Sequence, residues 1–309
     1  EKNVGLTNNI LLWGPSAVGK TTLSLAFVRH LELLSLSANH DFVYSVLDKH
    51  ADSPVFSDFE KPDPTEKLQD RIFVVQRQPK AERASQYKLD AQFSHCITIR
   101  DVQGKTSTDY ARETDFDTSY SVSVDNFEHL IIVLDPTAQP DERKSAKEDL
   151  IRLCHKLNRN KASKHKKRSL AICLSKMDMM EHVFDEVEHA FKVHFKITAD
   201  EVAAYLNGIP IEIKYFYTSS LGYYILDNSN VNKVKNYDDD GWLQEPEQWE
   251  PVNVAAPFFW IFTQAEDEYY KKTGSITYKM KKWWRSFSKK EKNNASWKIE
   301  GDASHDFYE

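Results

Sequence analysis

Residues 14–21, near the start of the chain, have the composition of a loop that binds phosphate. They read Gly-Pro-Ser-Ala-Val-Gly-Lys-Thr and match the pattern G-x-x-x-x-G-K-[S/T] without departure. In such a loop the glycines let backbone N–H groups turn toward a β-phosphate, and the following helix adds its positive dipole. We expect Lys20 to bridge the β- and γ-oxygens and the Thr21 hydroxyl to bind Mg²⁺. The loop residues expected at the nucleotide are Gly14, Ser16, Ala17, Val18, Gly19, Lys20, Thr21 and Thr22.

A second segment has residues that could select the base. Ser175-Lys176-Met177-Asp178 follows the apolar run Leu170–Leu174. A carboxylate at a strand end can accept two hydrogen bonds from guanine, from N1–H and the exocyclic amine, and adenine lacks that pair of donors. Asp178 therefore predicts guanine specificity, with the stem of Lys176 along the base plane. After the last apolar run, Ser219 and Ser220 are expected to give a backbone N–H to guanine O6.

A third segment could meet the metal and the γ-phosphate. Asp101-Val102-Gln103-Gly104 follows the apolar run Cys96–Arg100. At the carboxyl end of a strand, Asp101 could hold a Mg²⁺-bound water and the Gly104 N–H could meet the γ-phosphate. An ordinary turn that begins with aspartate would contain the same residues, so the order of the segments along the chain is what favours the first interpretation.

In order and position these segments resemble the GTPases of the translation-factor and Ras-like superfamily, over about residues 9–270. The chain looks like a divergent member with long insertions. The resemblance implies a molecular switch that binds GTP or GDP with Mg²⁺ and acts on an effector or activator protein. It also nominates Thr65, in Asp63-Pro64-Thr65, as a Mg²⁺ ligand and γ-phosphate sensor, although an ordinary turn containing proline is the alternative. The implied metal ligands are Thr21, Thr65 and Asp101, and the implied catalytic residues are Lys20, Thr65, Gly104 and Lys105.

Two residues depart from the family pattern. Ser175 stands where the family usually has asparagine, and Lys105 stands where many hydrolysing members have a glutamine that orients water. A charged lysine cannot accept a proton from that water, so GTP hydrolysis is expected to be slow or to depend on a partner. Two alternatives follow: a module that binds nucleotide without hydrolysing it, or an ATP-specific P-loop NTPase, which would leave Asp178 without a role.

The apolar runs alternate with stretches of helical spacing, which predicts an α/β fold. We expect a doubly wound, mostly parallel six-stranded sheet with helices on both faces and one antiparallel hairpin, Ile72–Gln76 with Cys96–Arg100. The expected strands are Ile10–Trp13, Ile72–Gln76, Cys96–Arg100, Leu130–Leu134, Leu170–Leu174 and Ile211–Tyr217. The expected helices cover about residues 19–34, 145–157, 179–191, 199–206 and 257–270.

The same pattern divides the chain into a nucleotide-binding domain, residues 1–270, and an extension, residues 271–309. Two long segments, about 35–70 and 227–256, are predicted to be insertions. The net charge is −6, and Lys271 to Lys292 carries a local charge of +8. Within Ile276–Lys292, Trp283, Trp284 and Phe287 recur at helical spacing, so this basic tail is predicted to be a docked helix or a contact with an anionic membrane surface. The acidic remainder of the chain argues against nucleic acid.

Composition bounds the remaining possibilities. Hydrophobic residues make up 40% of the chain, and no apolar run is long enough to cross a membrane. A cytoplasmic protein, peripheral at a membrane if the tail binds lipid, is therefore expected. Cys96, Cys154 and Cys173 are too few and too scattered for a disulfide framework. The sequence starts at Glu1 without a methionine, which leaves open a preceding segment.

Overall fold

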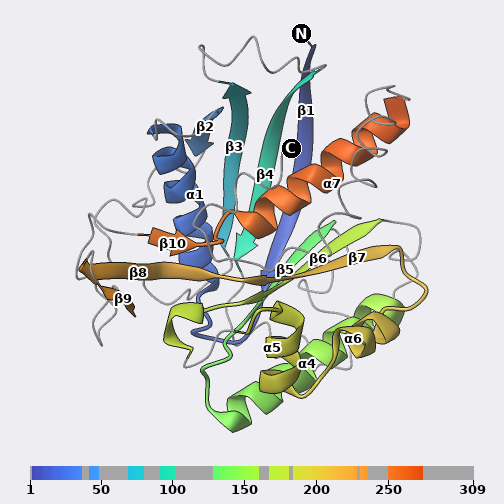
Figure 1. Cartoon of the computed structure of the whole chain (residues 1–309). Coiled ribbons are helices and arrows are strands. Elements are labelled where there is room, and N and C mark those ends of the chain that lie inside the picture. The colour runs from blue at the N-terminus through green and yellow to red at the C-terminus, as the bar shows by residue number, and fades with distance from the viewer. Residues whose placement is uncertain are drawn as a thin grey trace.

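A seven-stranded sheet forms the centre of the fold in the order β2-β3-β4-β1-β5-β6-β7 (Figure 1). The computed structural model describes residues 2–36, 42–48, 69–79, 91–101, 128–159, 167–180, 184–227, 230–235 and 250–273. Neighbouring strands from β4 to β7 are parallel, whereas β2 and β3 continue the sheet antiparallel to their neighbours. The strands are β1 (Lys2–Trp13), β2 (Phe42–Asp48), β3 (Gln69–Pro79), β4 (Ala91–Asp101), β5 (His129–Leu134), β6 (Arg168–Leu174) and β7 (Ile211–Tyr217).

This architecture confirms the predicted fold class and adds one strand to it. All six expected strands are present, and the expected hairpin is the β3–β4 pair, in which Val74 lies opposite Cys96. The added strand, β2, lies within the segment 35–70 that was predicted to be an insertion. Its run of aromatic and β-branched residues, Phe42-Val43-Tyr44-Ser45-Val46, is typical of a strand. The strand was not predicted because the whole segment was interpreted as an insertion on account of its length.

β5 and β6 are interior strands of the main sheet, with a neighbouring strand on each side. Every residue of both strands is buried, because helices cover both faces. Successive side chains of a strand point to opposite faces, so β1 divides its apolar residues between two cores. Ile10 and Leu12 belong to one core, and Leu11 and Trp13 belong to the other.

Helices α1 (Lys20–Leu36) and α7 (Ala256–Thr273) cover the first face (Figure 1). Their contact includes Phe27 of α1, whose ring stacks on that of Phe258 with centroids 4.0 Å apart. Phe259 and Phe262 meet the same ring edge-on. The predicted helix at 257–270 is therefore confirmed, and α7 runs three residues past the predicted domain boundary.

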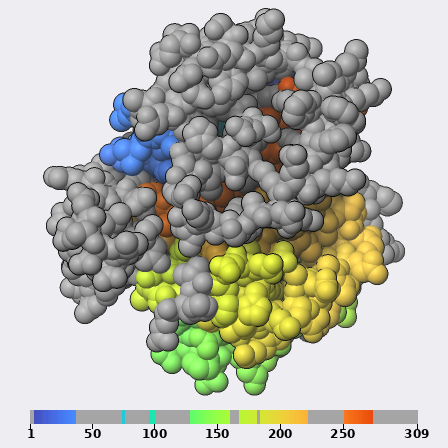
Figure 2. All heavy atoms as spheres, viewed as in Figure 1, coloured from blue at the N-terminus to red at the C-terminus, as the bar shows by residue number. Residues whose placement is uncertain are grey.

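Helices α4 (Pro140–Arg159), α5 (Val187–Phe195) and α6 (Ala199–Tyr205) pack on the opposite face. Figure 2 shows the yellow α5–α6 segment on the outer surface. A proline opens α4, with Asp141 and Glu142 in its first turn, where the helix dipole favours acids. A capping box formed by Thr198 and Glu201 starts α6.

The helix predicted over residues 179–191 is misplaced. A short 3-10 turn, η2 (Met177–Met179), stands at its expected start, and the backbone is extended at Met180 and again at Glu186. Extended residues cannot continue a helix, so α5 begins only at Val187. Apolar spacing detected a helix here but could not detect the break that precedes it.

A second, three-stranded antiparallel sheet follows β7 in the chain. Its order is β10-β8-β9, with β8 (Ser219–Asp227), β9 (Asn230–Lys235) and β10 (Glu250–Val252). The predicted insertion at 227–256 therefore contributes two strands. Leu221 of β8 packs against the core that contains α1, so this sheet is joined to the main domain.

Several predictions concern residues outside the described ranges. Thr65, Gly104 and Lys105 belong to this group, as does the basic tail from residue 274 onward. These predictions therefore remain predictions. None of the described helices is long and apolar enough to cross a bilayer.

Candidate nucleotide-binding site

The predicted site segments meet at one edge of the main sheet. In a parallel sheet the carboxyl ends of neighbouring strands share an edge, and ligands bind there where the chain leaves in two directions. Here Leu12 of β1 lies opposite Asp101, and Leu134 of β5 lies opposite Leu174 of β6. Leu174 in turn lies opposite Tyr217 of β7. The loops that follow these strands are therefore neighbours in space.

The phosphate loop, residues 14–19, lies between β1 and α1 as predicted. Its first residue passes so close to β5 that a Cβ on Gly14 would lie 2.3 Å from the carbonyl oxygen of Val133. Ala17 and Gly19 have left-handed backbones, with φ of 62° and 91°. Left-handed residues within a turn direct successive N–H groups into a concavity that binds anions. The loop thus has the shape that a phosphate requires.

Lys20 lies folded over the loop that precedes it. Its ammonium donates to the carbonyl oxygens of Gly14 at 2.9 Å and Pro15 at 2.7 Å, and the residue is only 6% exposed. A buried ammonium needs such partners, because burial without them would be costly. Thr21 follows in the first turn of α1, where the Ser24 hydroxyl donates to the Thr21 carbonyl at 2.8 Å. The predicted phosphate ligand and metal ligand therefore lie at the same helix terminus.

The predicted base-reading segment follows β6 directly. The backbone N–H and the hydroxyl of Ser175 both bond the carbonyl of Leu134, at 2.8 and 3.1 Å, so this residue ties the segment to β5. Lys176 has a left-handed backbone, with φ of 55° and ψ of 36°. Two residues later, the Asp178 carboxylate accepts a hydrogen bond from the Ser219 hydroxyl.

The Thr218–Ser220 segment also reaches this site, and it leads into a strand that the sequence did not predict. Thr218 bonds back to the Leu174 carbonyl at 2.8 Å and accepts from the Met177 N–H at 3.3 Å. Ser219 is already the first residue of β8 and lies opposite Val252 of β10. Because the chain passes straight from one sheet into the other, Ser219 is buried and its hydroxyl faces the Asp178 carboxylate.

The predicted Mg²⁺ ligands are only partly placed. Thr21 lies at the phosphate loop, and the backbone of Asp101 ends β4 beside Leu12. Thr65 lies outside the described residues. Within the part of the chain that the structure describes, no three His, Cys, Asp or Glu side chains are grouped for metal binding.

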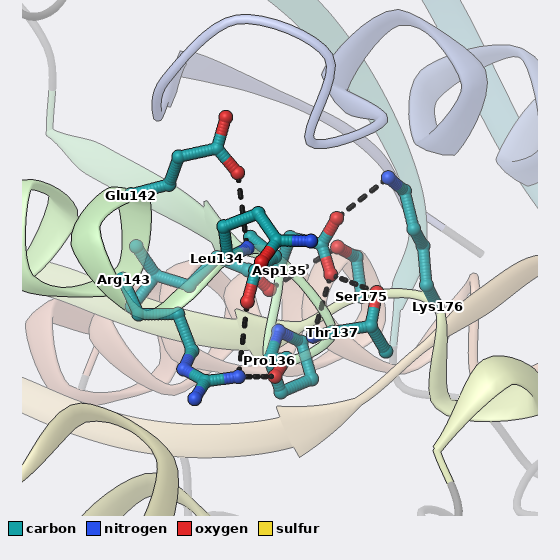
Figure 3. A network of polar contacts seen from close by, with 10 residues as sticks. Leu134, Asp135, Pro136, Thr137, Glu142, Arg143, Ser175 and Lys176 are labelled. Atoms are coloured by element: carbon teal, nitrogen blue, oxygen red, sulfur yellow. Dashed lines mark hydrogen bonds and ion pairs between the residues drawn. The ribbon is translucent and has the colours of Figure 1, made fainter.

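Asp135, which the sequence prediction missed, lies at the centre of the polar network in Figure 3. Its side chain is 7% exposed and accepts a 2.6 Å hydrogen bond from the Lys176 ammonium. The other carboxylate oxygen accepts from the Thr137 N–H and hydroxyl at 2.8 and 2.6 Å. The signal was present in the sequence, because Asp135 follows a buried parallel strand just as Ser175 does.

Comparison with known proteins gives similarity of structure only. No family model and no curated protein sequence matches the chain. Among solved structures, a small GTPase of Trypanosoma brucei, Arl6/BBS3 with a bound GppNp analogue, is 12% identical with a TM-score of 0.42. It covers 84% of this chain and 98% of its own. The signal recognition particle receptor SRβ-GTP/SRX complex of Chaetomium thermophilum has 16% identity and a TM-score of 0.40, covering 69% and 94%. Similarity at this level does not indicate what this chain binds.

Proposed function

We propose that this chain is a GTP-binding molecular switch. The observation that supports the proposal best is the position of Asp178. Its carboxylate lies at the sheet edge that also carries the phosphate loop and is oriented by the Ser219 hydroxyl. A phosphate loop alone would accept any nucleoside triphosphate. An oriented carboxylate two strands away would favour guanine over adenine, because it accepts from a pair of donors that only guanine has.

The residues divide between the two ends of the nucleotide. The N–H groups of residues 14–19 and the Lys20 ammonium would hold the phosphates, and Thr21 would hold Mg²⁺. Asp178 would accept from guanine N1–H and the exocyclic amine, with the Lys176 stem along the base. Bound Mg²⁺ would neutralise negative charge on the phosphate oxygens. Lys20 already lies over the loop, where its ammonium donates to the carbonyl oxygens of Gly14 and Pro15.

The switch itself would involve residues 65 and 101–105, which we propose tighten on the γ-phosphate and signal its presence to an effector protein. Lys105 follows Gly104 directly, where a water-orienting residue would be expected. Hydrolysis would then be slow or would require an activator protein. The same lysine favours a second candidate function, a module that binds guanine nucleotide and does not turn it over.

Calorimetric titration of the Mg²⁺ complexes of GTP, GDP and ATP tests the proposal. Wild-type chain is expected to bind GTP and GDP in preference to ATP, and Asp178→Ala to lose about 1–3 kcal/mol of that binding, since guanine donors are left without an acceptor. Asp185→Ala is the matched control, because Asp185 is exposed and lies only seven residues further along the chain. Equal affinity for ATP, or no loss in Asp178→Ala, would overturn the guanine assignment.

Phosphate release over many turnovers separates the two candidate functions. A switch is expected to release phosphate slowly from GTP, and faster when a cell extract supplies an activator. A chain that binds GTP tightly and never releases phosphate under either condition is the non-hydrolysing module.

A further inference from the structure

Asp135 has two separate sets of contacts, one for each carboxylate oxygen. Oδ1 accepts from the Thr137 N–H at 2.8 Å and from its hydroxyl at 2.6 Å, within the turn between β5 and α4. Oδ2 accepts from Lys176 Nζ at 2.6 Å, across to the turn that follows β6 (Figure 3). The carboxylate is thus fixed through one oxygen and presents the other to the lysine.

Lys176 is held on both sides through its backbone. Before it, the Ser175 N–H donates to Leu134 at 2.8 Å, and after it, the Met179 N–H donates to the Lys176 carbonyl at 2.9 Å. Its own backbone is left-handed, which non-glycine residues rarely adopt. The side chain, by contrast, is 36% exposed, so without a partner it would sample many rotamers. The contact with Asp135 removes much of that freedom.

We propose that Asp135 is a positioning residue for nucleotide binding. Through its ion pair it fixes the Lys176 stem as one wall of the guanine site before the nucleotide binds. Ordering a long side chain in advance raises affinity, because the ligand no longer has to order it. This inference rests on the proposed function, since it assigns Asp135 a role in holding the base.

A purely structural role for Asp135 would look different. A carboxylate that only closed the turn before α4 would need Thr137 and nothing from β6. The hydrogen bond from Lys176 also ties Asp135 to the proposed base-reading turn, because Lys176 lies two positions before Asp178 in that turn. If Asp135 is a positioning residue, its substitution should lower the affinity only for ligands that carry the base. If its role is purely structural, the substitution should lower the affinity for every ligand, or should lower only the free energy of unfolding.

The test compares Mg²⁺-GDP with Mg²⁺-tripolyphosphate, which lacks the base, by calorimetry. Asp135→Asn keeps the side-chain volume and an oxygen for Thr137 but removes the charge that faces Lys176. It is expected to bind GDP roughly threefold to tenfold more weakly and tripolyphosphate as tightly as the wild type. Glu142→Gln is the matched control, because it removes an exposed carboxylate that caps α4 by accepting from the Gln139 N–H at 3.0 Å.

A double-mutant cycle with Lys176→Met completes the test. Methionine keeps an apolar stem without the charge, so Asp135→Asn is expected to cause no further loss of GDP affinity in that background. Should Asp135→Asn fail to fold, Thr137→Val removes the hydroxyl that donates to Oδ1 and keeps the carboxylate and the bond from the backbone N–H of residue 137. A smaller loss of affinity, again confined to GDP, is then expected.

Three results would overturn the inference: unchanged GDP affinity in the folded variant, equal loss of GDP and tripolyphosphate, or a further loss in the Lys176→Met background. These results presuppose a wild type that binds GDP. A wild type that binds tripolyphosphate but not GDP would instead overturn the proposed function, and this inference with it.

Discussion

Gly14 gives the most direct structural prediction, because a methyl group at this position has no room. A Cβ there would lie 2.3 Å from the carbonyl oxygen of Val133 and 3.2 Å from Val18, whereas ordinary contacts begin at 3.4 Å. The loop and the end of β5 must therefore separate by about 1 Å. Val133 is fully buried and paired with Cys173 of β6, so the phosphate loop is the part that has to move.

We expect Gly14→Ala to lower the free energy of unfolding by about 1–3 kcal/mol, the usual cost of overpacking. The displaced loop is also expected to lose tripolyphosphate binding, since its N–H groups no longer converge. Gly5→Ala is the control, because Gly5 lies exposed in β1, the strand that precedes the loop, with nothing within 4 Å of a Cβ. Glycine within a strand loses more conformational entropy on folding than alanine does. Gly5→Ala is therefore expected to leave the free energy of unfolding unchanged or to raise it by up to about 1 kcal/mol.

Urea denaturation and calorimetry on the two variants decide the matter. Only Gly14→Ala should lower the free energy of unfolding, and only Gly14→Ala should weaken the binding of tripolyphosphate. Equal stability and equal tripolyphosphate affinity in both variants would refute the close approach of the loop to β5, and with it the loop geometry described above.

Two other predictions follow from packing and from charge. Phe27→Ala should lower the free energy of unfolding by about 3–5 kcal/mol, because the ring is fully buried against Phe258, and Phe27→Leu should cost less; equal urea midpoints for Phe27→Ala and the wild type would contradict this. Hydrogen bonds from the backbone and then the side chain of Thr198 lower the pKa of Glu201 in the folded protein. The capping box should therefore stabilise α6 fully at pH values above the pKa that Glu201 has in the unfolded chain. This stabilisation should be lost as the pH falls through the lowered pKa of the folded protein. An NMR titration should show the Glu201 pKa rising toward its ordinary value in Thr198→Ala, and an unchanged pKa would count against the box.

Sequence was sufficient where one local pattern determines the structure. The phosphate loop needs glycines and a lysine at fixed spacing, so residues 14–21 predicted both the turn and its place between a strand and a helix. β5 and β6 were equally clear, because strands buried on both faces are apolar throughout. Local chemistry also placed Asp178 at a strand end.

Sequence was insufficient where distant contacts determine the structure. For Ser219 the sequence predicted only a backbone N–H toward the base. Pairing of β8 with β10 places this residue in a second sheet, and the residues of β10 lie some thirty positions away. Asp135 follows β5 and Lys176 follows β6, so their contact joins two turns that lie far apart in the sequence, and neither neighbourhood alone reveals it. Apolar spacing predicted a helix from residue 179, and the extended backbone at Glu186 delays it to Val187.

The central claim, that Asp178 reads a guanine base, has a test based on exchanged specificity. Xanthine carries a carbonyl in place of the exocyclic amine of guanine, so a side chain that both accepts and donates should suit it better than a carboxylate. We predict that the wild type binds GDP more tightly than xanthosine diphosphate and that Asp178→Asn reverses this order while tripolyphosphate affinity stays constant. If Asp178→Asn left the preference between the two bases unchanged, Asp178 would not contact the base and the account of the site would be wrong.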